Sequence, residues 1–433
     1  MRTEEKVDRS TPLAAADELL VGTEYLKVLD KHRRRLHAAG GAHPNRVLHY
    51  DDVFTLLLLS FFNPALRSLR TIDDASRGPA MRQCLDVERA CRSTLSDANA
   101  CLDPSLLLPI INDLRKKVPD LPRADAALQQ LLNRAIAVDG SLFSVAADVV
   151  WGLRKRKAWA GPGGDDRFVR LDLQFCCARG VIQEAEVNGR GTSETTAARR
   201  KIEAGKLYIA DRGIFSFAYV EDLLRARADL VLRIKKSQRL TVREERPVSV
   251  KSRAAGVLSD RRVTLDPAAK KPAKAAANAN AGVAGVADAP AQVLREVVVF
   301  DPNHPDKPIR LLTSLLDVDA EIVGETYRWR WQIELFFRWL KVHANFRHLI
   351  SHSKNGLTLG FYVATIAVLL IYLRTGRRRV SKYAYNALCL VAQGAMTPEQ
   401  ALEIVAFRER EKDLERARLA RKRAAIAAAK TKV

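Results

Sequence analysis

The spacing of apolar residues changes near residue 134 and divides the chain into two kinds of structure. Residues 51–133 carry apolar positions at helical spacing, beginning with the stretch DDVFTLLLLSFF. From residue 134 onwards, short apolar or alternating runs replace this pattern, and such runs predict β-strands. Strands are expected at 134–140, 170–177, 181–187, 206–213 and 229–235, with a helix at 214–227. The sequence therefore predicts a helical region followed by an α/β core.

Two of the predicted strands end in an aspartate. The run RAIAVDG closes with Asp139 and Gly140, and the run KLYIADRG ends at Asp211. Asp-Gly is a turn signal, so both aspartates are expected at strand ends, where sheet enzymes commonly place their chemistry. A lone aspartate at a strand end is more often an ordinary turn residue, and the pattern alone leaves both interpretations open.

The alternation of predicted strands and helices stops between residues 237 and 309. Short strand-like pieces flank a run of Ala, Lys, Asn and Gly from Asp266 to Gln292, which contains no aromatic residue. This composition predicts a disordered or extended loop, because it offers little apolar surface to bury. The run RLLTSLL at 310–316 is expected to return to the core sheet.

The longest apolar run is FYVATIAVLLIYL, residues 361–373. Thirteen residues are too few to span a bilayer, so this run predicts a core helix and no membrane segment. The tail from Arg408 is rich in Lys, Arg and Ala and predicts a solvated helix.

The stretch YRWRWQIELFFRWLK, from Tyr327 to Lys341, has no Gly or Pro and predicts one continuous helix. At about 100° per residue, Tyr327, Arg330, Glu334 and Lys341 share an arc of about 60°. Much of the remaining circumference is apolar, and unpaired buried charge is expensive, so this polar stripe needs an explanation. A solvated stripe is one explanation, and ion pairing between Arg330 and Glu334 at i,i+4 is another.

Composition narrows the class of partner. Lys and Arg number 72 against 50 acidic residues, which gives a formal charge of +22 and a pI near 10. This excess indicates a polyanionic partner, most simply nucleic acid, although a basic protein without such a partner stays an alternative. The six cysteines form no CxxC pair, which favours reduced thiols in a cytoplasmic protein, and the charged N-terminus shows no signal-peptide pattern.

The spacing Tyr-x2-Arg-x3-Glu-x6-Lys at residues 327–341 resembles the signature of the IS-four family of bacterial insertion-sequence transposases. The segment YIADRGIFSF around Asp211 and the segment AVDGS around Asp139 also resemble this family. The resemblance implies a DDE phosphoryl-transfer enzyme: an α/β protein with a ribonuclease-H-like mixed sheet core, a β-rich insertion, and helical N-terminal and C-terminal regions. The order of predicted strands suits such a sheet.

The chain is accordingly divided into six segments. They are a basic N-terminal segment (1–50), a helical DNA-binding domain (51–133), a first core part (134–236), the β-rich insertion with its loop at 266–292 (237–309), a second core part with the signature helix (310–350), and a helical C-terminal region with a basic tail (351–433).

The resemblance implies that Asp139, Asp211 and Glu334 are the catalytic carboxylates and hold two Mg²⁺ ions, for which Mn²⁺ substitutes. Carboxylates are the hard ligands that such ions need for phosphodiester attack. The remaining site residues are predicted to bind DNA: Tyr327, Arg330, Lys341, Arg212, Arg233, Lys235 and Trp331. Trp331, with Trp329, is a candidate for stacking on an extruded base, although buried tryptophans more often belong to a core.

The predicted function is cut-and-paste DNA transposition by hydrolysis and strand transfer, with a DNA hairpin intermediate implied by the resemblance. The predicted partners are the element's terminal inverted repeats and target DNA, bound by a homodimer. Two alternatives stay open: a nuclease without strand transfer, and a catalytically silent DNA-binding derivative of the same fold.

Overall fold

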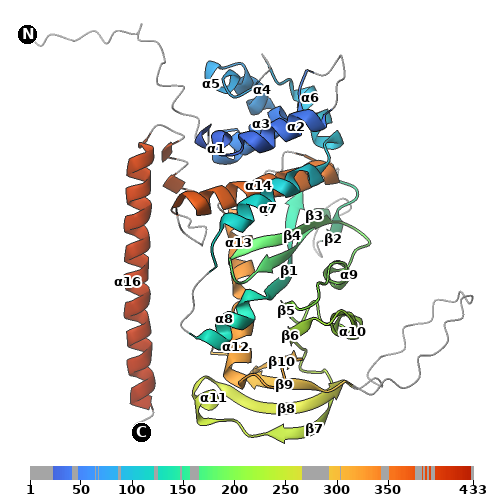
Figure 1. Cartoon of the computed structure of the whole chain (residues 1–433), viewed down its shortest axis with the longest axis vertical. Helices are drawn as coiled ribbons and strands as arrows, with labels where there is room; N and C mark the ends of the chain where they lie inside the picture. The colour runs from blue at the N-terminus through green and yellow to red at the C-terminus, as the bar shows by residue number, and fades with distance from the viewer. Residues whose placement is uncertain are drawn as a thin grey trace, which may run out of the picture.

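A mixed β-sheet forms the centre of the molecule, with helices on both faces and a layer of helices across one end (Figure 1). The computed structural model describes residues 23–40, 47–63, 65–66, 68–85, 89–120, 125–146, 149–156, 165–265, 292–302, 304–342, 351–375, 383, 386–387, 390–391 and 395–430. The predicted loop at 266–292 lies outside these residues except for Gln292.

Short helices precede the first strand; those from residue 50 onwards agree with the helical spacing predicted for 51–133, whereas the two helices before residue 40 lie in the predicted basic N-terminal segment. Several begin at side-chain caps: Ser68 accepts from the amide of Thr71, and Asp125 accepts from the amide of Leu128. Their bounds are Thr23–Val28 (α1), Asp30–Ala39 (α2), Tyr50–Phe62 (α3), Leu69–Ser76 (α4), Pro79–Arg82 (α5), Arg92–Cys101 (α6), Pro104–Leu107 (the 3₁₀ helix η2), Leu108–Lys117 (α7) and Ala126–Asn133 (α8).

The core sheet has the order β4–β3–β1–β5–β6, with β2 also paired to β3. The pairs β4–β3 and β3–β1 are antiparallel, whereas β1–β5 and β5–β6 are parallel, so the predicted ribonuclease-H-like mixed sheet is confirmed. The strand bounds are Ala135–Val145 (β1), Leu153–Arg156 (β2), Asp165–Cys176 (β3), Val181–Asn188 (β4), Leu207–Ala210 (β5) and Asp229–Arg233 (β6).

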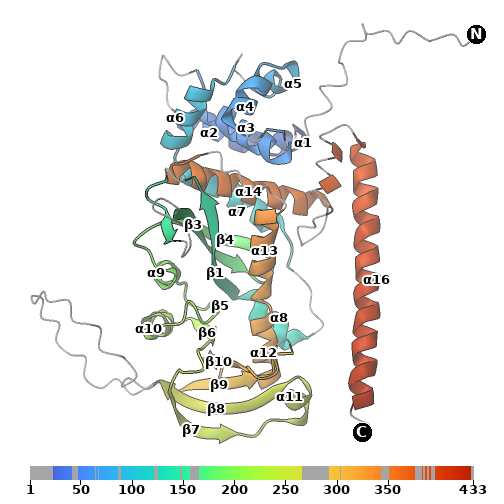
Figure 2. The ribbon, with the colours of Figure 1, turned by 180° about the vertical axis from the view of Figure 1, so that it is seen from behind.

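Side chains of alternate residues along these strands enter two separate cores. Ala137 of β1 and Ile209 of β5 lie in the core shared with α8, α12 (Ala320–Arg328) and α13 (Trp331–Val342). Their neighbours Val138 and Ala210 lie in the core shared with α9 (Glu194–Arg199) and α10 (Phe217–Arg225). The sheet therefore separates α12 and α13 from α9 and α10, as Figure 1 and Figure 2 show.

Helix α14 (Lys354–Thr375) joins the N-terminal helices to the sheet. It contacts α3, α6 and α7 as well as β4, and Figure 2 shows it between these two parts. The stretch Lys354–Leu373 is long and apolar enough to cross a membrane by length and composition, but 78% of an 18-residue window within it is buried inside the structure. This helix is longer than the predicted thirteen-residue run, and its burial is that of a core helix. The last described helix is α16 (Pro398–Lys430), and most of its described side chains are exposed.

The predicted β-rich insertion continues the core sheet. Antiparallel strands β10, β9, β8 and β7 follow β6 in that order, and their hydrophobic residues join the same two cores. The bounds are Leu240–Arg246 (β7), Val250–Ala254 (α11), Val257–Leu265 (β8), Leu294–Val299 (β9) and Ile309–Thr313 (β10). Strand β10 is the predicted return to the core sheet: it pairs with β6 over Leu311–Thr313, and β9 of the insertion pairs with it along its whole length.

Deleting Asp266–Gln292 is expected to leave the fold intact. Val263 and Leu294 are directly paired across β8 and β9, so Asn-Gly in place of the segment leaves a three-residue loop, Leu265-Asn-Gly, which can close the hairpin. The deleted stretch has no aromatic residue to contribute to a core. Thermal melting should change by less than about 3 °C, and circular dichroism should match the parent chain. A much larger drop would mean that the segment packs against the insertion strands.

Candidate active site

The two aspartates lie side by side at one rim of the sheet. Val138 of β1 pairs with Ala210 of β5 in parallel, so Asp139 and Asp211 each follow one member of that pair. Neighbouring strands are about 4.8 Å apart, and alternation directs both side chains to the face of Ala137 and Ile209. That face is the one covered by α12, which ends in the first residues of the signature stretch, and by α13, which contains most of the rest.

The expected position of Asp139 at a strand end is wrong. Strand β1 runs through Asp139 and Gly140 to Val145, because β3 pairs with it from Ile136 to Val145. The turn signal is overridden by this long antiparallel pairing. Asp139 nevertheless lies where β5 ends, so its side chain reaches a rim even though its own strand continues. Asp211 follows β5 directly.

The signature stretch is also not one continuous helix. Helix α12 ends at Arg328, α13 begins at Trp331, and the intervening turn has short-range hydrogen bonds. The amides of Trp329 and Arg330 donate three residues back, to Thr326 and Tyr327, at 3.2 and 3.0 Å, which is 3₁₀ geometry. Arg330 lies in this turn and is only 8% exposed. Its buried charge is compensated by ion pairs with Asp139 and Glu334.

Residues of the signature stretch contact the rim carboxylates directly. The Tyr327 hydroxyl donates to Asp211 Oδ1 at 3.0 Å. Arg330 Nη1 donates to Asp139 Oδ2 at 3.2 Å, and its Nη2 donates to Glu334 Oε1 at 2.5 Å. One guanidinium therefore bonds to carboxylates from β1 and α13, and the expected pairing of Arg330 with Glu334 is present.

Burial and charge act differently on the two aspartates. Burial raises the pKa of Asp139 to about 6, and the nearby carboxylates of Glu194 and Glu334 add to this effect, while Arg330 opposes it. Burial also acts to raise the pKa of Asp211, but the amide of Arg212, the guanidinium groups of Arg330 and Arg233 and the hydroxyl of Tyr327 together lower it. The neighbouring cations therefore outweigh burial at Asp211, whose pKa is lowered, but not at Asp139, whose pKa is raised.

The raised pKa of Asp139 predicts a pH dependence of stability. The folded protein binds this proton more tightly than the unfolded chain, so ionisation costs stability as the pH rises from about 4 to about 6. The cost corresponds to roughly 2–3 kcal/mol. Denaturant titrations across this range should show the decline in the wild type and a smaller decline in Asp139→Asn. Equal pH dependence in both proteins would contradict the assignment.

The other predicted DNA-binding residues surround the rim at different depths. Arg233 at the end of β6 lies 3.4 Å from Asp211 Oδ1, whereas Arg212 and Lys235 are exposed. Lys341 at the end of α13 is half-buried, with its ammonium 5.2 Å from the centre of the Phe143 ring, and burial lowers its pKa. Phe143 lies four residues beyond Asp139 on β1, so Lys341 is displaced roughly 13 Å along the strand.

The two tryptophans of the signature stretch differ in exposure. Trp329 is partly buried and packs against the core, as expected of a buried aromatic residue. Trp331 is 47% exposed, with the guanidinium of Arg338 5.8 Å from its ring centre. Trp331 is therefore available for stacking, and Trp329 is not.

The chemistry of the rim fits a hard divalent cation, although its present geometry does not chelate one. Among the residues that the structure describes, no three Asp, Glu, His or Cys side chains are arranged to hold a metal ion. The Arg330 guanidinium bonds to two of the carboxylates instead. The donors are carboxylate oxygens, which Mg²⁺ and Mn²⁺ prefer. Burial is the main cause of the raised pKa of Asp139, the charges of Glu194 and Glu334 add to it, and Arg330 offsets it only in part.

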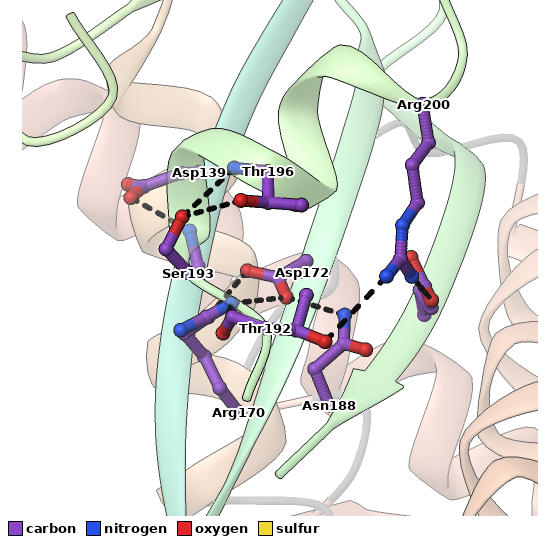
Figure 3. A network of polar contacts seen from close by, with 10 residues as sticks. Asp139, Arg170, Asp172, Asn188, Thr192, Ser193, Thr196 and Arg200 are labelled. Carbon is purple, nitrogen blue, oxygen red and sulfur yellow. Dashed lines mark hydrogen bonds and ion pairs between the residues drawn. The ribbon is translucent and has the colours of Figure 1, made fainter. Parts of the chain in front are cut away.

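Sequence reasoning did not identify a polar network beside the rim. Asp172 of β3 accepts from Arg170 and from Asn188, and Arg170 also donates to the carbonyl of Thr192 (Figure 3). Glu194 follows this network at the start of α9. No motif marks these residues, because they meet only when β3, β4 and α9 assemble.

A sheet of this order, with acidic side chains at the shared rim of β1 and β5, is typical of ribonuclease-H-like phosphoryl-transfer proteins. The family model described as "Transposase DDE domain" matches residues 131–370, more than half of the chain. The chain belongs to this transposase DDE domain family. Membership confirms the predicted insertion-sequence DDE class, while the narrower IS-four assignment stays a prediction.

Curated relatives carry transposase names. A Sinorhizobium fredii protein named as transposase y4zB is 28% identical over 235 residues, which are 53% of this chain and 60% of that protein. A Geobacillus stearothermophilus protein named as the transposase for insertion sequence element IS5377 is 35% identical over 77 residues, 18% of this chain and 20% of its own length. A Synechocystis protein named for element IS4SA is 36% identical over 84 residues, 18% of this chain and 24% of its own length. The matches thus span at most 60% of these relatives.

Among solved structures, the piggyBac transposase in a synaptic complex with hairpin DNA matches with a TM-score of 0.35 and 11% identity. The match covers 90% of this chain and 83% of that chain. At this score, the two folds are too different for conclusions about this chain.

Proposed function

We propose that the chain is the transposase of a bacterial insertion sequence of the IS-four family, which excises its element and joins it to target DNA. The observation that carries this proposal is the meeting of Asp139, Asp211 and the α12–α13 turn at one rim of the sheet. Glu334 is linked to the same rim through Arg330. Three distant chain segments thus supply the carboxylates that phosphodiester chemistry requires.

Asp139, Asp211 and Glu334 would hold two Mg²⁺ ions, with Mn²⁺ as a substitute, and bound ions activate the attacking oxygen and stabilise the leaving one. Arg330 must then leave the carboxylates, and its planar fork suits a DNA phosphate. Its Nε is buried without a hydrogen-bond partner among the described residues, so it has a donor to offer. Burial raises the pKa of Tyr327 to about 12, which keeps its hydroxyl protonated as a donor.

The DNA partners would be the terminal inverted repeats and the target duplex, bound by a homodimer in the cytoplasm. The charge of +22 supplies the non-specific attraction to phosphates. Arg212 and Lys235 are exposed beside the rim, and Trp331 offers an exposed ring for an unstacked base. The helical region 51–133 is the proposed DNA-end-binding domain.

Incubation with DNA that carries the element's own ends tests this function. Products are separated on a strand-resolving gel after reaction with Mg²⁺ or with EDTA. The proposal predicts nicked, hairpin and joined products with Mg²⁺ and none with EDTA. Nicks without joined products would favour the nuclease alternative, and binding without any cleavage would favour the silent derivative.

Replacing Lys341 with Ala is expected to weaken the binding of end DNA. The half-buried ammonium lies on the α13 face that carries Glu334 but cannot bind a cation, so its proposed partner is a phosphate. Gel-shift titrations at several salt concentrations should show lower affinity and a log–log salt slope shallower by about one. The control is Lys307→Ala, in the exposed loop between β9 and β10. Unchanged affinity and slope in Lys341→Ala would make Lys341 a structural residue.

A further inference from the structure

The start of α9 brings a fourth carboxylate to the rim from the opposite face of the sheet. Glu194 is half-buried at the first position of α9, and its two oxygens face the two backbone segments that follow the aspartates. A Cβ on Gly140, directly after Asp139, would lie 2.6 Å from Glu194 Oε1. A Cβ on Gly213, two residues after Asp211, would lie 3.5 Å from Glu194 Oε2.

Gly140 creates the space through which Glu194 reaches the rim. Its missing Cβ would also lie 2.6 Å from Asp172 Oδ1, so any larger residue would displace one of these carboxylates. Since Gly140 lies within β1 rather than in a turn, the requirement for glycine here is one of close approach. The absence of a side chain at Gly140 thus leaves room beside Asp139, and the carboxylates of Glu194 and Asp172 occupy it.

The surrounding network holds Glu194 in place without neutralising it. Ser193 caps α9 by accepting from the amide of Thr196, and Arg170 donates to the carbonyl of Thr192, so the first turn is fixed on both sides (Figure 3). The charge of Arg170 lowers the pKa of Glu194, but this guanidinium makes two hydrogen bonds to Asp172 at 2.7 and 3.0 Å. Within the described part of the chain, Glu194 forms no salt bridge.

Electrostatics couples Glu194 to both aspartates. The charge of Glu194 raises the pKa of Asp139, and the charge of Asp211 raises that of Glu194, after the larger effect of burial. An acidic residue in the first turn of a helix is also favoured by the helix dipole, which is the structural alternative. The dipole accounts for the position of Glu194 on α9, but it does not account for the space at Gly140.

We propose that Glu194 is a fourth carboxylate ligand of the divalent metal site, acting with Asp139 and Asp211 at the rim. This inference rests on the proposed function, because it adds a ligand to the site that the function requires. It divides the metal site between the two faces of the sheet, with α9 on one side and α13 on the other. Asp139, on the strand between them, would then contribute to both halves.

Mn²⁺ binding to the full-length protein without DNA tests this inference independently of activity. Calorimetric titrations compare the wild type with Glu194→Gln, Glu194→Asp, Asp139→Asn and the control Glu203→Gln, an exposed carboxylate in the loop after α9. Glu194→Gln should weaken Mn²⁺ affinity at least about tenfold, Glu194→Asp should weaken it less, and Glu203→Gln should leave it unchanged. Circular dichroism checks that each variant is folded, and the rise in melting temperature caused by Mn²⁺ provides a second readout.

The outcomes separate this inference from the proposed function. If Asp139→Asn lost Mn²⁺ affinity while Glu194→Gln kept that of the wild type, the inference would be wrong and the metal site would stand. If the wild type bound no Mn²⁺ in a saturable way, both the metal site and the role of Glu194 would be wrong.

Discussion

Glu334→Gln is expected to abolish cleavage of transposon-end DNA while leaving DNA binding intact. Gln keeps the shape of the side chain and its contact surface on α13, but it removes the charge with which Glu334 would hold a cation. Loss of one member of a catalytic group that acts as a unit lowers the rate by about a thousandfold or more. Cleavage should therefore fall below detection on a strand-resolving gel, and gel shifts should be unchanged.

A matched variant makes this prediction specific. Glu325→Gln applies the same change to a more exposed carboxylate on α12, which pairs with Arg328 at 2.9 Å. It should cleave like the wild type. If Glu334→Gln also kept near-normal cleavage in Mg²⁺, Glu334 would be only the ion-pair partner of Arg330, and the proposed triad would be wrong.

Asp260→Ala is expected to lower the free energy of unfolding by about 3–5 kcal/mol. Arg295 of β9 is 1% exposed, and its Nε and Nη2 donate to the two carboxylate oxygens of Asp260 on β8, each at 2.7 Å. Removing Asp260 leaves a buried guanidinium without its compensating charge. Urea titrations should show the loss, and Asp306→Ala, in an exposed loop, should show almost none.

The same arginine connects the insertion to the active site. Its Nη1 donates to the carbonyls of Leu315 and Val318, in the segment that leads from β10 into α12. Asp260→Ala removes the carboxylate that orients this guanidinium, so it should also reduce cleavage, because α12 carries Tyr327. Replacing Arg295 with Met and Asp260 with Leu together should restore part of the stability, since an apolar pair leaves no buried charge but also removes the donor to the carbonyls of Leu315 and Val318. A double variant as unstable as Asp260→Ala would contradict this explanation.

The parts of the site that depend on one chain segment could be predicted from the sequence. Asp211 follows a short, fully buried strand, and the apolar pattern of that strand identified its end. Glu334 and Arg330 were found through their spacing, and their ion pair is a local contact. In both cases, the information lies within about ten consecutive residues.

The parts that depend on distant pairing could not be predicted in this way. Strand β1 continues past Asp139 because β3 pairs with it. The Asp-Gly turn signal is local and contains no information about this distant pairing. The signature stretch divides at Trp329, and Arg330 in the resulting turn bonds to Asp139, 191 residues earlier in the chain, a contact that local spacing does not encode. Glu194 resembles an ordinary first-turn acidic residue until the space at Gly140 is known.

The most direct test is the position of Mn²⁺, located by its anomalous scattering in crystals of the full-length protein. The account predicts a peak at the rim of β1 and β5, within about 2.0–2.4 Å of carboxylate oxygens of Asp139 and Asp211. It also predicts that Arg330 no longer bonds to Asp139 when the ion is present. A peak elsewhere, with Arg330 still bonded to both Asp139 and Glu334, would contradict the assignment of this rim as the catalytic metal site.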